Sequence, residues 1–102
     1  MKTKKKLIPK KKPVLEKTVK AAVKKRLKEL GVFQFWPVQF GLGSDLTLDC
    51  FVCSSGLFYA IECKAPGKLP TPRQRHTIDK LREHGADVYV IDNVEDAKKL
   101  VL

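Results

Sequence analysis

The spacing of apolar residues predicts a first helix between Pro13 and Leu30. Apolar side chains recur there every three or four residues, as they do along one face of a helix; they are Leu15, Val19, Ala22, Val23, Leu27 and Leu30. Gly31 follows and can adopt the left-handed conformation that ends many helices. The opposite face carries five lysines, so this helix is amphipathic and basic; they are Lys17, Lys20, Lys24, Lys25 and Lys28.

Three further segments have the composition of β-strands. Val32 to Phe40 is aromatic and β-branched but contains Pro37, which indicates an edge strand or a broken strand. Leu46 to Cys53 and Leu57 to Cys63 are rich in strand formers. The Ser54-Ser55-Gly56 segment between them predicts that the two strands form a hairpin.

A second helix has a clear start in the sequence. Thr71 can be its N-cap, Pro72 occupies the first helical position, and Gln74 completes a Thr-x-x-Gln capping box. Gly85 ends the helix. Its apolar side is formed by Ile78 and Leu81.

The last elements complete an α/β fold. Ala86 to Ile91 reads as a strand, so the helix before it forms a crossover back onto the sheet. Asp92 with Glu95 predicts the cap of a final short helix that reaches Leu100. The order helix, broken strand, hairpin, helix, strand, helix predicts a mixed β-sheet flanked by helices.

The positive charge of the chain is concentrated near its start. Residues 1–28 hold 13 lysines or arginines and one acid, for a net charge of +12, whereas residues 29–102 have a net charge of −2. We expect residues 1–12 to form a flexible basic arm and residues 13–102 to form one domain. A basic arm suits a polyanion such as nucleic acid, because each neutralised phosphate releases counterions. A solubilising tail and an arm attracted to acidic lipids are the alternatives.

Membrane insertion and secretion are not expected from this sequence. No stretch is as long and apolar as a membrane span, and no apolar signal-peptide core follows the basic start. We therefore expect a cytoplasmic protein without a membrane partner. Cys50, Cys53 and Cys63 are odd in number and lie in predicted strands, which favours reduced thiols. Zinc binding by these thiols with His76 or His84 is disfavoured, because no second CxxC motif or close histidine pair is present.

Charged residues interrupt both strands of the predicted hairpin. Glu62 and Lys64 end an apolar strand and point to the same side, because side chains alternate along a strand. Asp49 interrupts the preceding strand and can come near Glu62 in the hairpin. Two adjacent carboxylates repel each other unless a cation lies between them. Their hard oxygen atoms suit Mg²⁺ or Mn²⁺, and the backbone carbonyl of Cys63 can add a ligand.

Such a metal site can assist the attack of water on a phosphate. The metal ion lowers the pKa of a bound water and stabilises charge on the phosphate. Lys64 would orient this water or help to deprotonate it. The opposing hypothesis is a basic DNA-binding module with an inactive acidic cluster. A protein that had lost the activity would be expected to lack at least one of Asp49, Glu62 and Lys64.

The spacing of these residues resembles a known nuclease signature. Asp49, twelve intervening residues and then Glu62-x-Lys64 is the pattern of the PD-(D/E)xK nucleases. The run GLFYAIECKAPGK from Gly56, followed by Thr71 and Gln74, resembles the VRR-Nuc family, which is common in phage genomes. The similarity covers roughly residues 14–92.

The resemblance implies a restriction-endonuclease-like fold and a metal-dependent DNA endonuclease. Stand-alone members of the family are dimers that resolve four-way DNA junctions. By this resemblance Asp49 and Glu62 bind the metal, Lys64 is catalytic, and Gln74 lies at the edge of the site. The family also has a metal-proximal glutamate on its first helix, where Glu16 is the candidate in this chain.

One departure and one alternative accompany the resemblance. The family has a proline before the aspartate, and this chain has Leu48. That proline is not a metal ligand, so its loss leaves the predicted site intact. Asp45 is a second candidate aspartate, but it lies four residues too early for the spacing of the family.

Several of these residues also have a purely structural interpretation. Gln74 could serve only the capping box, and Glu16 could pair with Lys20 one helical turn later. The aromatic residues before the hairpin belong to the core or to a dimer contact rather than to a base-stacking surface; they are Phe33, Phe35, Trp36 and Phe40. Basic residues that flank the proposed site are candidate phosphate contacts; they are Lys17, Lys20, Lys24, Lys68, Arg73 and Arg75.

Overall fold

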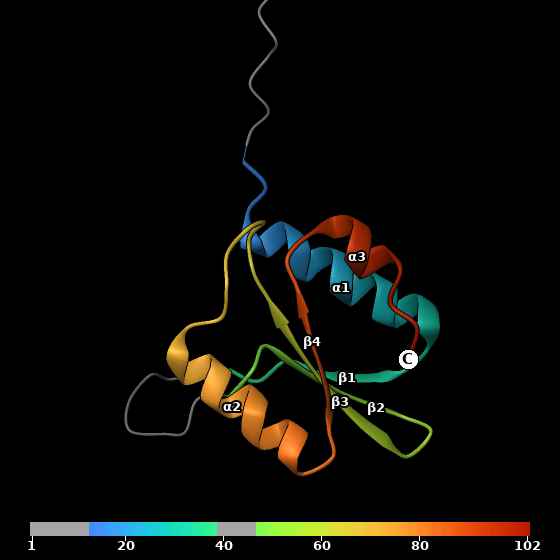
Figure 1. Ribbon diagram of the computed structural model, residues 1–102. Coiled ribbons are helices and arrows are strands. Elements are labelled where there is room, and N and C mark those ends of the chain that lie inside the picture. The colour runs from blue at the N-terminus through green and yellow to red at the C-terminus, as the bar shows by residue number, and fades with distance from the viewer. Residues whose placement is uncertain (1–12, 39–46) are drawn as a thin grey trace, which may run out of the picture.

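A computed structural model describes residues 13–38 and 47–102 of the chain. The predicted basic arm, Phe40 and Asp45 lie outside the described residues. The described residues form three helices and four strands, shown in Figure 1. In chain order they are α1 (Glu16–Leu30), β1 (Phe33–Phe35), β2 (Cys50–Ser54), β3 (Leu57–Cys63), α2 (Pro72–Glu83), β4 (Asp87–Ile91) and α3 (Val94–Lys98).

The strands form one mixed sheet in the order β1-β2-β3-β4. β1 and β3 are antiparallel to β2, whereas β4 is parallel to β3, so α2 is the crossover that the sequence predicts. Ser54 pairs with Leu57, which leaves Ser55 and Gly56 as the turn of the hairpin. Both have positive φ, 51° and 80°. Two-residue turns of this kind match the right-handed twist of the paired strands.

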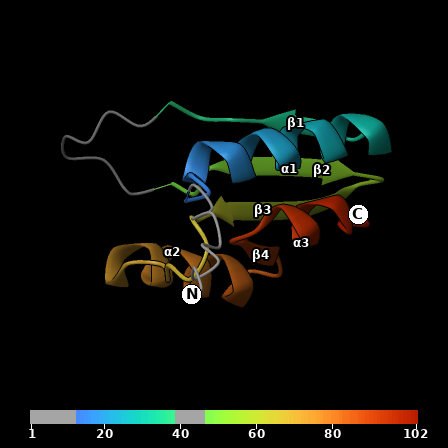
Figure 2. The same cartoon turned by 90° about the horizontal axis from the view of Figure 1, so that it is seen from above.

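The sheet lies between two helical layers (Figure 1), and Figure 2 looks onto the side of the sheet that α1 and α3 cover. α1 and α3 cover one face, and α2 covers part of the other. The core on the α1 side is formed by Val19, Val23, Leu27, Cys50, Val52, Tyr59, Ile61, Cys63, Ile91, Ala97 and Leu100. The smaller core on the α2 side is formed by Leu48, Ala60, Ile78 and Val88.

The first helix begins three residues later than the apolar spacing predicts. Leu15 is an extended N-cap with φ −89° and ψ 155°, and about half of its surface is exposed. The apolar stripe therefore starts in effect at Val19, which is fully buried. Gly31 ends the helix with φ 71°, as predicted, and its N–H reaches the carbonyl groups of the last turn.

The capping box of α2 is formed in full. Thr71 Oγ1 accepts a hydrogen bond from the Gln74 backbone N–H at 3.2 Å, and Gln74 Oε1 accepts one from the Thr71 backbone N–H at 2.9 Å. Ile78 is fully buried against the sheet, as the sequence predicts. This cap fixes the point at which the chain leaves the β3–α2 loop.

The predicted cap of the last helix is wrong by one residue. Asn93 is the N-cap, and its side chain accepts from the Asp96 backbone N–H at 2.7 Å. Asp92 instead accepts from the Gly67 backbone N–H at 3.2 Å and so joins the end of β4 to the β3–α2 loop. The helix ends at Lys98 rather than at Leu100, which packs into the core beyond it.

None of the helices within residues 13–38 and 47–102 is long and apolar enough to cross a membrane.

Candidate functional site

The predicted acidic cluster forms where the β2–β3 hairpin opens. The ladder between these strands ends at the pair Cys50 and Ile61, so Asp49 and Glu62 come next on either side. β2 starts later than the predicted Leu46, and Asp49 therefore lies just before the strand instead of within it. Its backbone N–H donates to Glu62 Oε1 at 3.2 Å. The two carboxylates are thus neighbours, as the hairpin predicts.

The side chain of Asp49 makes the hydrogen bond to β3 that a strand residue would otherwise make through its backbone. Its Oδ2 accepts a hydrogen bond from the Cys63 backbone N–H at 2.8 Å. Only 13% of the Asp49 side chain is exposed. The N–H and C=O groups of one strand residue point to the same neighbouring strand, so the Cys63 carbonyl faces the side on which Asp49 lies. From this side the Cys63 carbonyl can contribute an oxygen ligand to a metal ion bound at Asp49.

Glu62 is the buried charged residue of the described structure, with 2% of its surface exposed. Burial raises its pKa to about 7, and the charge of Asp49 adds to this rise, while the Lys64 ammonium opposes it. Lys64 Nζ lies 3.7 Å from Glu62 Oε2 and is itself mostly buried. Glu62 and Lys64 therefore share one side of β3, as alternation predicts. A nearby divalent cation would favour the ionised form of a carboxylate in this position more strongly than the single charge of a lysine does.

Lys20 joins the first helix to this cluster. Its Nζ lies 3.3 Å from Glu16 Oε2 and 3.4 Å from Asp49 Oδ1. Burial lowers the pKa of Lys20, but the carboxylates of Asp49 and Glu16 outweigh this effect and raise it. Glu16 does pair with Lys20 at i+4, and through Lys20 it reaches the edge of the site. In the described ranges, no three Asp, Glu, His or Cys side chains are grouped closely enough to hold a metal ion.

Gln74 has the structural role that its place in the capping box predicts. Its side-chain oxygen accepts from the Thr71 backbone N–H, and it stands at the start of α2. Thr71 and Gln74 follow the loop that leaves β3 directly after Lys64. In this arrangement the oxygen serves the backbone of the helix, and a role at the site stays a prediction.

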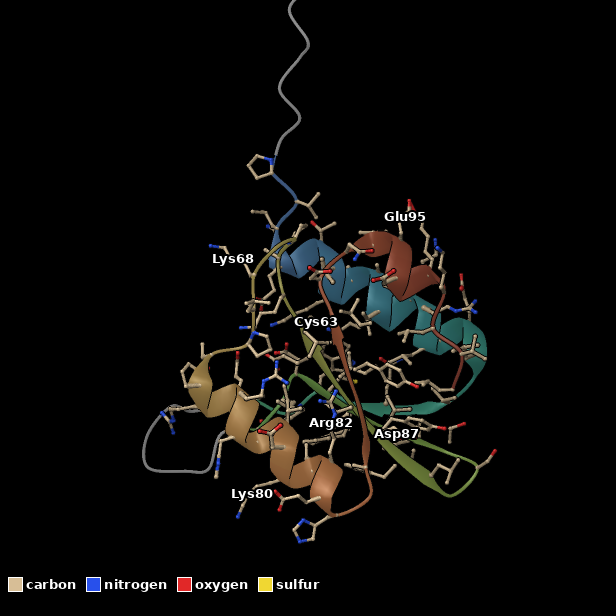
Figure 3. All side chains as sticks on the ribbon, in the orientation of Figure 1. Cys63, Lys68, Lys80, Arg82, Asp87 and Glu95 are labelled. Carbon is tan, nitrogen blue, oxygen red and sulfur yellow. The ribbon has the colours of Figure 1, made fainter. Side chains whose placement is uncertain are left out.

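The candidate phosphate contacts differ in their surroundings. Lys17, Lys68, Arg73 and Arg75 are exposed. Lys68 extends away from the body of the protein (Figure 3). Lys24 Nζ instead lies over the ring of Trp36, 4.9 Å from its centroid, a cation–π contact. The ammonium of Lys20 is held by two carboxylates.

The cysteines are free thiols without the geometry of a zinc site. Cys50 and Cys63 are buried on the α1 side, whereas Cys53 is exposed on the other face of the sheet. Burial raises the pKa of the Cys50 thiol to about 12, so this side chain stays protonated near neutral pH. The expected opposite orientation of Cys50 and Cys53 is confirmed.

Sequence reasoning missed the contact between Lys20 and Asp49. The i+4 spacing from Glu16 places Lys20 on the correct side of the helix, but the sequence indicates only Glu16 or a DNA phosphate as its partner. A salt bridge across 29 positions of the chain depends on how α1 packs over the end of the hairpin. No local pattern records that packing.

The structure resembles that of a known nuclease domain. No sequence profile of a protein family matches the chain, and no curated protein matches it in sequence. A solved structure described as "VRR_NUC domain" superposes with a TM-score of 0.71 and 25% sequence identity, and the match covers 83% of this chain and 91% of that one. This similarity and the Asp49, Glu62 and Lys64 signature agree: both support membership of the VRR-Nuc family, and the chain has the fold of a VRR_NUC nuclease domain of the PD-(D/E)xK type.

Proposed function

We propose that this chain is a metal-dependent endonuclease that hydrolyses DNA phosphodiester bonds. The observation that carries the proposal is that Asp49 and Glu62 lie next to each other, linked by a hydrogen bond, at the end of the hairpin opposite its turn. Asp49 donates its backbone N–H to Glu62, and Lys64 lies on the same side as Glu62. Hydrogen bonds and burial hold these groups in place before substrate arrives, which lowers the cost of organising a site.

The donor set fits Mg²⁺ or Mn²⁺. Asp49, Glu62 and the Cys63 carbonyl provide hard oxygen atoms, and Mg²⁺ in nucleases is held by one or two carboxylates together with water and phosphate. Glu62 is buried beside Asp49 with a raised pKa, so a divalent cation would favour its ionised form. A bound ion would lower the pKa of a water molecule and stabilise charge on the phosphate.

The remaining side chains position the reacting groups. Lys64, fixed by its contact with Glu62, orients the attacking water and assists in removing its proton. Before a metal ion binds, the Cys63 N–H and Lys20 hold the Asp49 carboxylate from two directions. In this proposal Glu16 supports the metal from the first helix, and Gln74 borders the site at the start of α2.

The DNA-binding surface of the proposal is the basic side of α1 together with the loop and helix after β3. Its exposed members are Lys17, Lys68, Arg73 and Arg75, with Lys24 beside them. Residues 1–12 add seven lysines to this charge. Contacts of this kind bind phosphates and carry no sequence information.

We further propose that two copies act together on branched DNA such as a four-way junction. A symmetric pair of subunits presents two sites and can cut two strands. The described structure contains a surface that suits such pairing. Phe33 is 68% exposed, Phe35 55% and Phe58 46%, on the part of the sheet that α2 leaves uncovered. With Phe51, Val52 and Cys53 they line a shallow apolar depression without a charged side chain.

A cleavage assay tests the proposed function. Labelled four-way junction, matched linear duplex and single strand are incubated with Mg²⁺, Mn²⁺ or EDTA, with Glu62→Ala protein alongside and Glu95→Ala as the control for loss of an acid. Symmetric metal-dependent cuts in the junction, absent in Glu62→Ala, are expected. Equal cutting of all substrates would remove only the branch selectivity. DNA binding without cutting under any metal would favour the inactive binding module.

A further inference from the structure

The ammonium of Lys20 occupies a position between two carboxylates at the edge of the site. It lies 3.3 Å from Glu16 Oε2 and 3.4 Å from Asp49 Oδ1. The side chain is 36% exposed, so it can move without unpacking the core. A monovalent cation thus already neutralises the aspartate that the proposed function assigns to a divalent ion.

The two oxygen atoms of Asp49 have different partners. Oδ2 accepts from the Cys63 backbone N–H, which is part of the sheet and cannot move away. Oδ1 is the atom that Lys20 contacts. A divalent cation that binds Asp49 therefore meets Lys20 at the more accessible oxygen, and the two cations repel each other.

We propose that Lys20 competes with the divalent cation for Asp49 and, once displaced, binds a phosphate of the DNA. This inference rests on the metal dependence proposed above and adds a positioning residue to it. Glu16 lies one helical turn before Lys20 and keeps the displaced ammonium near the site. Lys20 then exchanges one anionic partner, Asp49, for another, the DNA phosphate.

This exchange couples metal binding to DNA binding. The cation frees Lys20 for the phosphate, and the phosphate holds Lys20 away from Asp49. Because coupling between two ligands is reciprocal, each raises the affinity of the protein for the other. The site consequently loads its metal more weakly in free protein than in the DNA complex.

The test measures Mn²⁺ binding by calorimetry in the absence of DNA, with the full chain and with Lys20→Met. Lys17→Met is the matched control, since it removes the same charge from the same helix at an exposed position. Removal of this partly exposed ion pair is expected to tighten Mn²⁺ binding roughly two- to fivefold in Lys20→Met. A smaller change is expected in Lys17→Met. Equal changes in the two variants, or weaker binding in Lys20→Met, would overturn the inference.

A second measurement tests the coupling itself. Affinity for uncut DNA is determined with and without Ca²⁺, a divalent cation that also takes oxygen ligands. The gain on adding Ca²⁺ should be smaller in Lys20→Met and in Lys20→Gln than in the parent, and an unchanged gain contradicts the exchange. If the parent binds no Mn²⁺ through Asp49 and Glu62, the proposed metal dependence fails and this inference fails with it. If the parent binds Mn²⁺ but Lys20→Met binds it no more tightly, only the inference fails.

Discussion

The carboxylate of Asp49 is hydrogen-bonded to the backbone of Cys63, with Oδ2 2.8 Å from the Cys63 nitrogen. A residue of the proposed metal site thereby also terminates the sheet, because it satisfies an N–H that the departing β2 leaves unpaired. Structural and chemical roles coincide in one side chain. Substitutions can separate them, since an amide retains an acceptor oxygen and a methyl group does not.

Asp49→Asn should keep the fold and lose the activity. The Asn oxygen can still accept from Cys63, whereas the negative charge that faces Lys20 disappears. Substitution of a residue that only orients a metal ligand already lowers activity roughly 10- to 100-fold. Loss of a proposed ligand itself is therefore expected to lower the cleavage rate by more than about 100-fold. Asp49→Ala should in addition lower the free energy of unfolding by about 1–3 kcal/mol, because a buried N–H loses its acceptor.

Cleavage rates and urea unfolding of both variants check this separation. Asp79→Asn, at an exposed position of α2, serves as the control. Parental cleavage by Asp49→Asn would exclude Asp49 as a ligand and return attention to Asp45.

Glu62 should make the metal-free protein less stable as the pH rises. Its pKa is raised from 4.5 to about 7, mainly by burial. Between these values the unfolded carboxyl releases its proton and the folded one retains it, so the free energy of the unfolded state falls relative to that of the folded state. Stability is therefore greatest below pH 4.5 with respect to this group, falls up to pH 7, and is constant above it. The total loss is on the order of 3 kcal/mol.

Glu62→Gln removes this titration but keeps an acceptor for the Asp49 N–H. In EDTA at pH 8 the variant should resist urea better than the parent, and near pH 4 the two should be similar. Mg²⁺ should stabilise the parent at pH 8 and not the variant. Parallel pH profiles for the two proteins would show that Glu62 ionises in the fold without a penalty.

The elements with strong local signals were predicted well, and those defined by packing were not. β3 was predicted to the residue, because a polar turn and a charged pair bound an apolar run. The start of α2 was predicted because its capping box is a local pattern. The starts of α1 and β2 were placed too early, since apolar residues at their ends could equally extend the element. Leu15 and Leu48 show this: the first is half exposed, and the second is buried outside any strand.

The same distinction applies to the candidate site. The approach of Asp49 to Glu62, and that of Lys64 to Glu62, follow from alternation and hairpin register, so the sequence predicted both. The places of Lys20 and Glu16 depend on how the first helix crosses the sheet. That crossing is set by Val19, Val23 and Leu27 packing into the core, which no spacing along the helix reveals.

Gln74 can be assigned by a substitution that leaves its cap intact. Glutamate at this position also completes a capping box, so Gln74→Glu should retain the thermal stability of the parent. If Gln74 borders the site, the added negative charge and the lost amide should lower cleavage roughly 10- to 100-fold. Parental cleavage by this variant would leave Gln74 with a capping role alone. Gln74→Ala provides the comparison in which the cap itself is lost.

The N-terminal lysines should govern the salt dependence of DNA binding. Each phosphate contact that is lost lowers the slope of log affinity against log salt by about 0.9. Replacing the seven lysines of residues 1–12 by serine keeps the length of the segment. Weaker binding and a flatter slope are expected in a fluorescence-anisotropy titration. An unchanged affinity and slope would identify the segment as a solubilising tail.

Exposed phenylalanines on the sheet should determine the oligomeric state. Phe33 and Phe58 both align with Cys53, so all three lie in one row across β1, β2 and β3. The exposed parts of Phe33, Phe35 and Phe58 together amount to about 300 Å² of apolar surface. The largest apolar patch on a typical monomer is of this size, roughly 300–600 Å², and is often functional. Phe33→Ser with Phe58→Ser should convert a dimer into a monomer in light scattering at micromolar concentration.

Leu69→Ser is the matched control for the dimer experiment, because Leu69 is 81% exposed but lies in the β3–α2 loop, away from that row. It should leave the mass unchanged. The double phenylalanine variant should also lose paired cutting of a four-way junction. It should still cut one strand of the junction at a time, since each subunit retains its own carboxylates. A variant that stays dimeric would place the interface on another face, and a parent that is monomeric at all concentrations would contradict the paired mechanism itself.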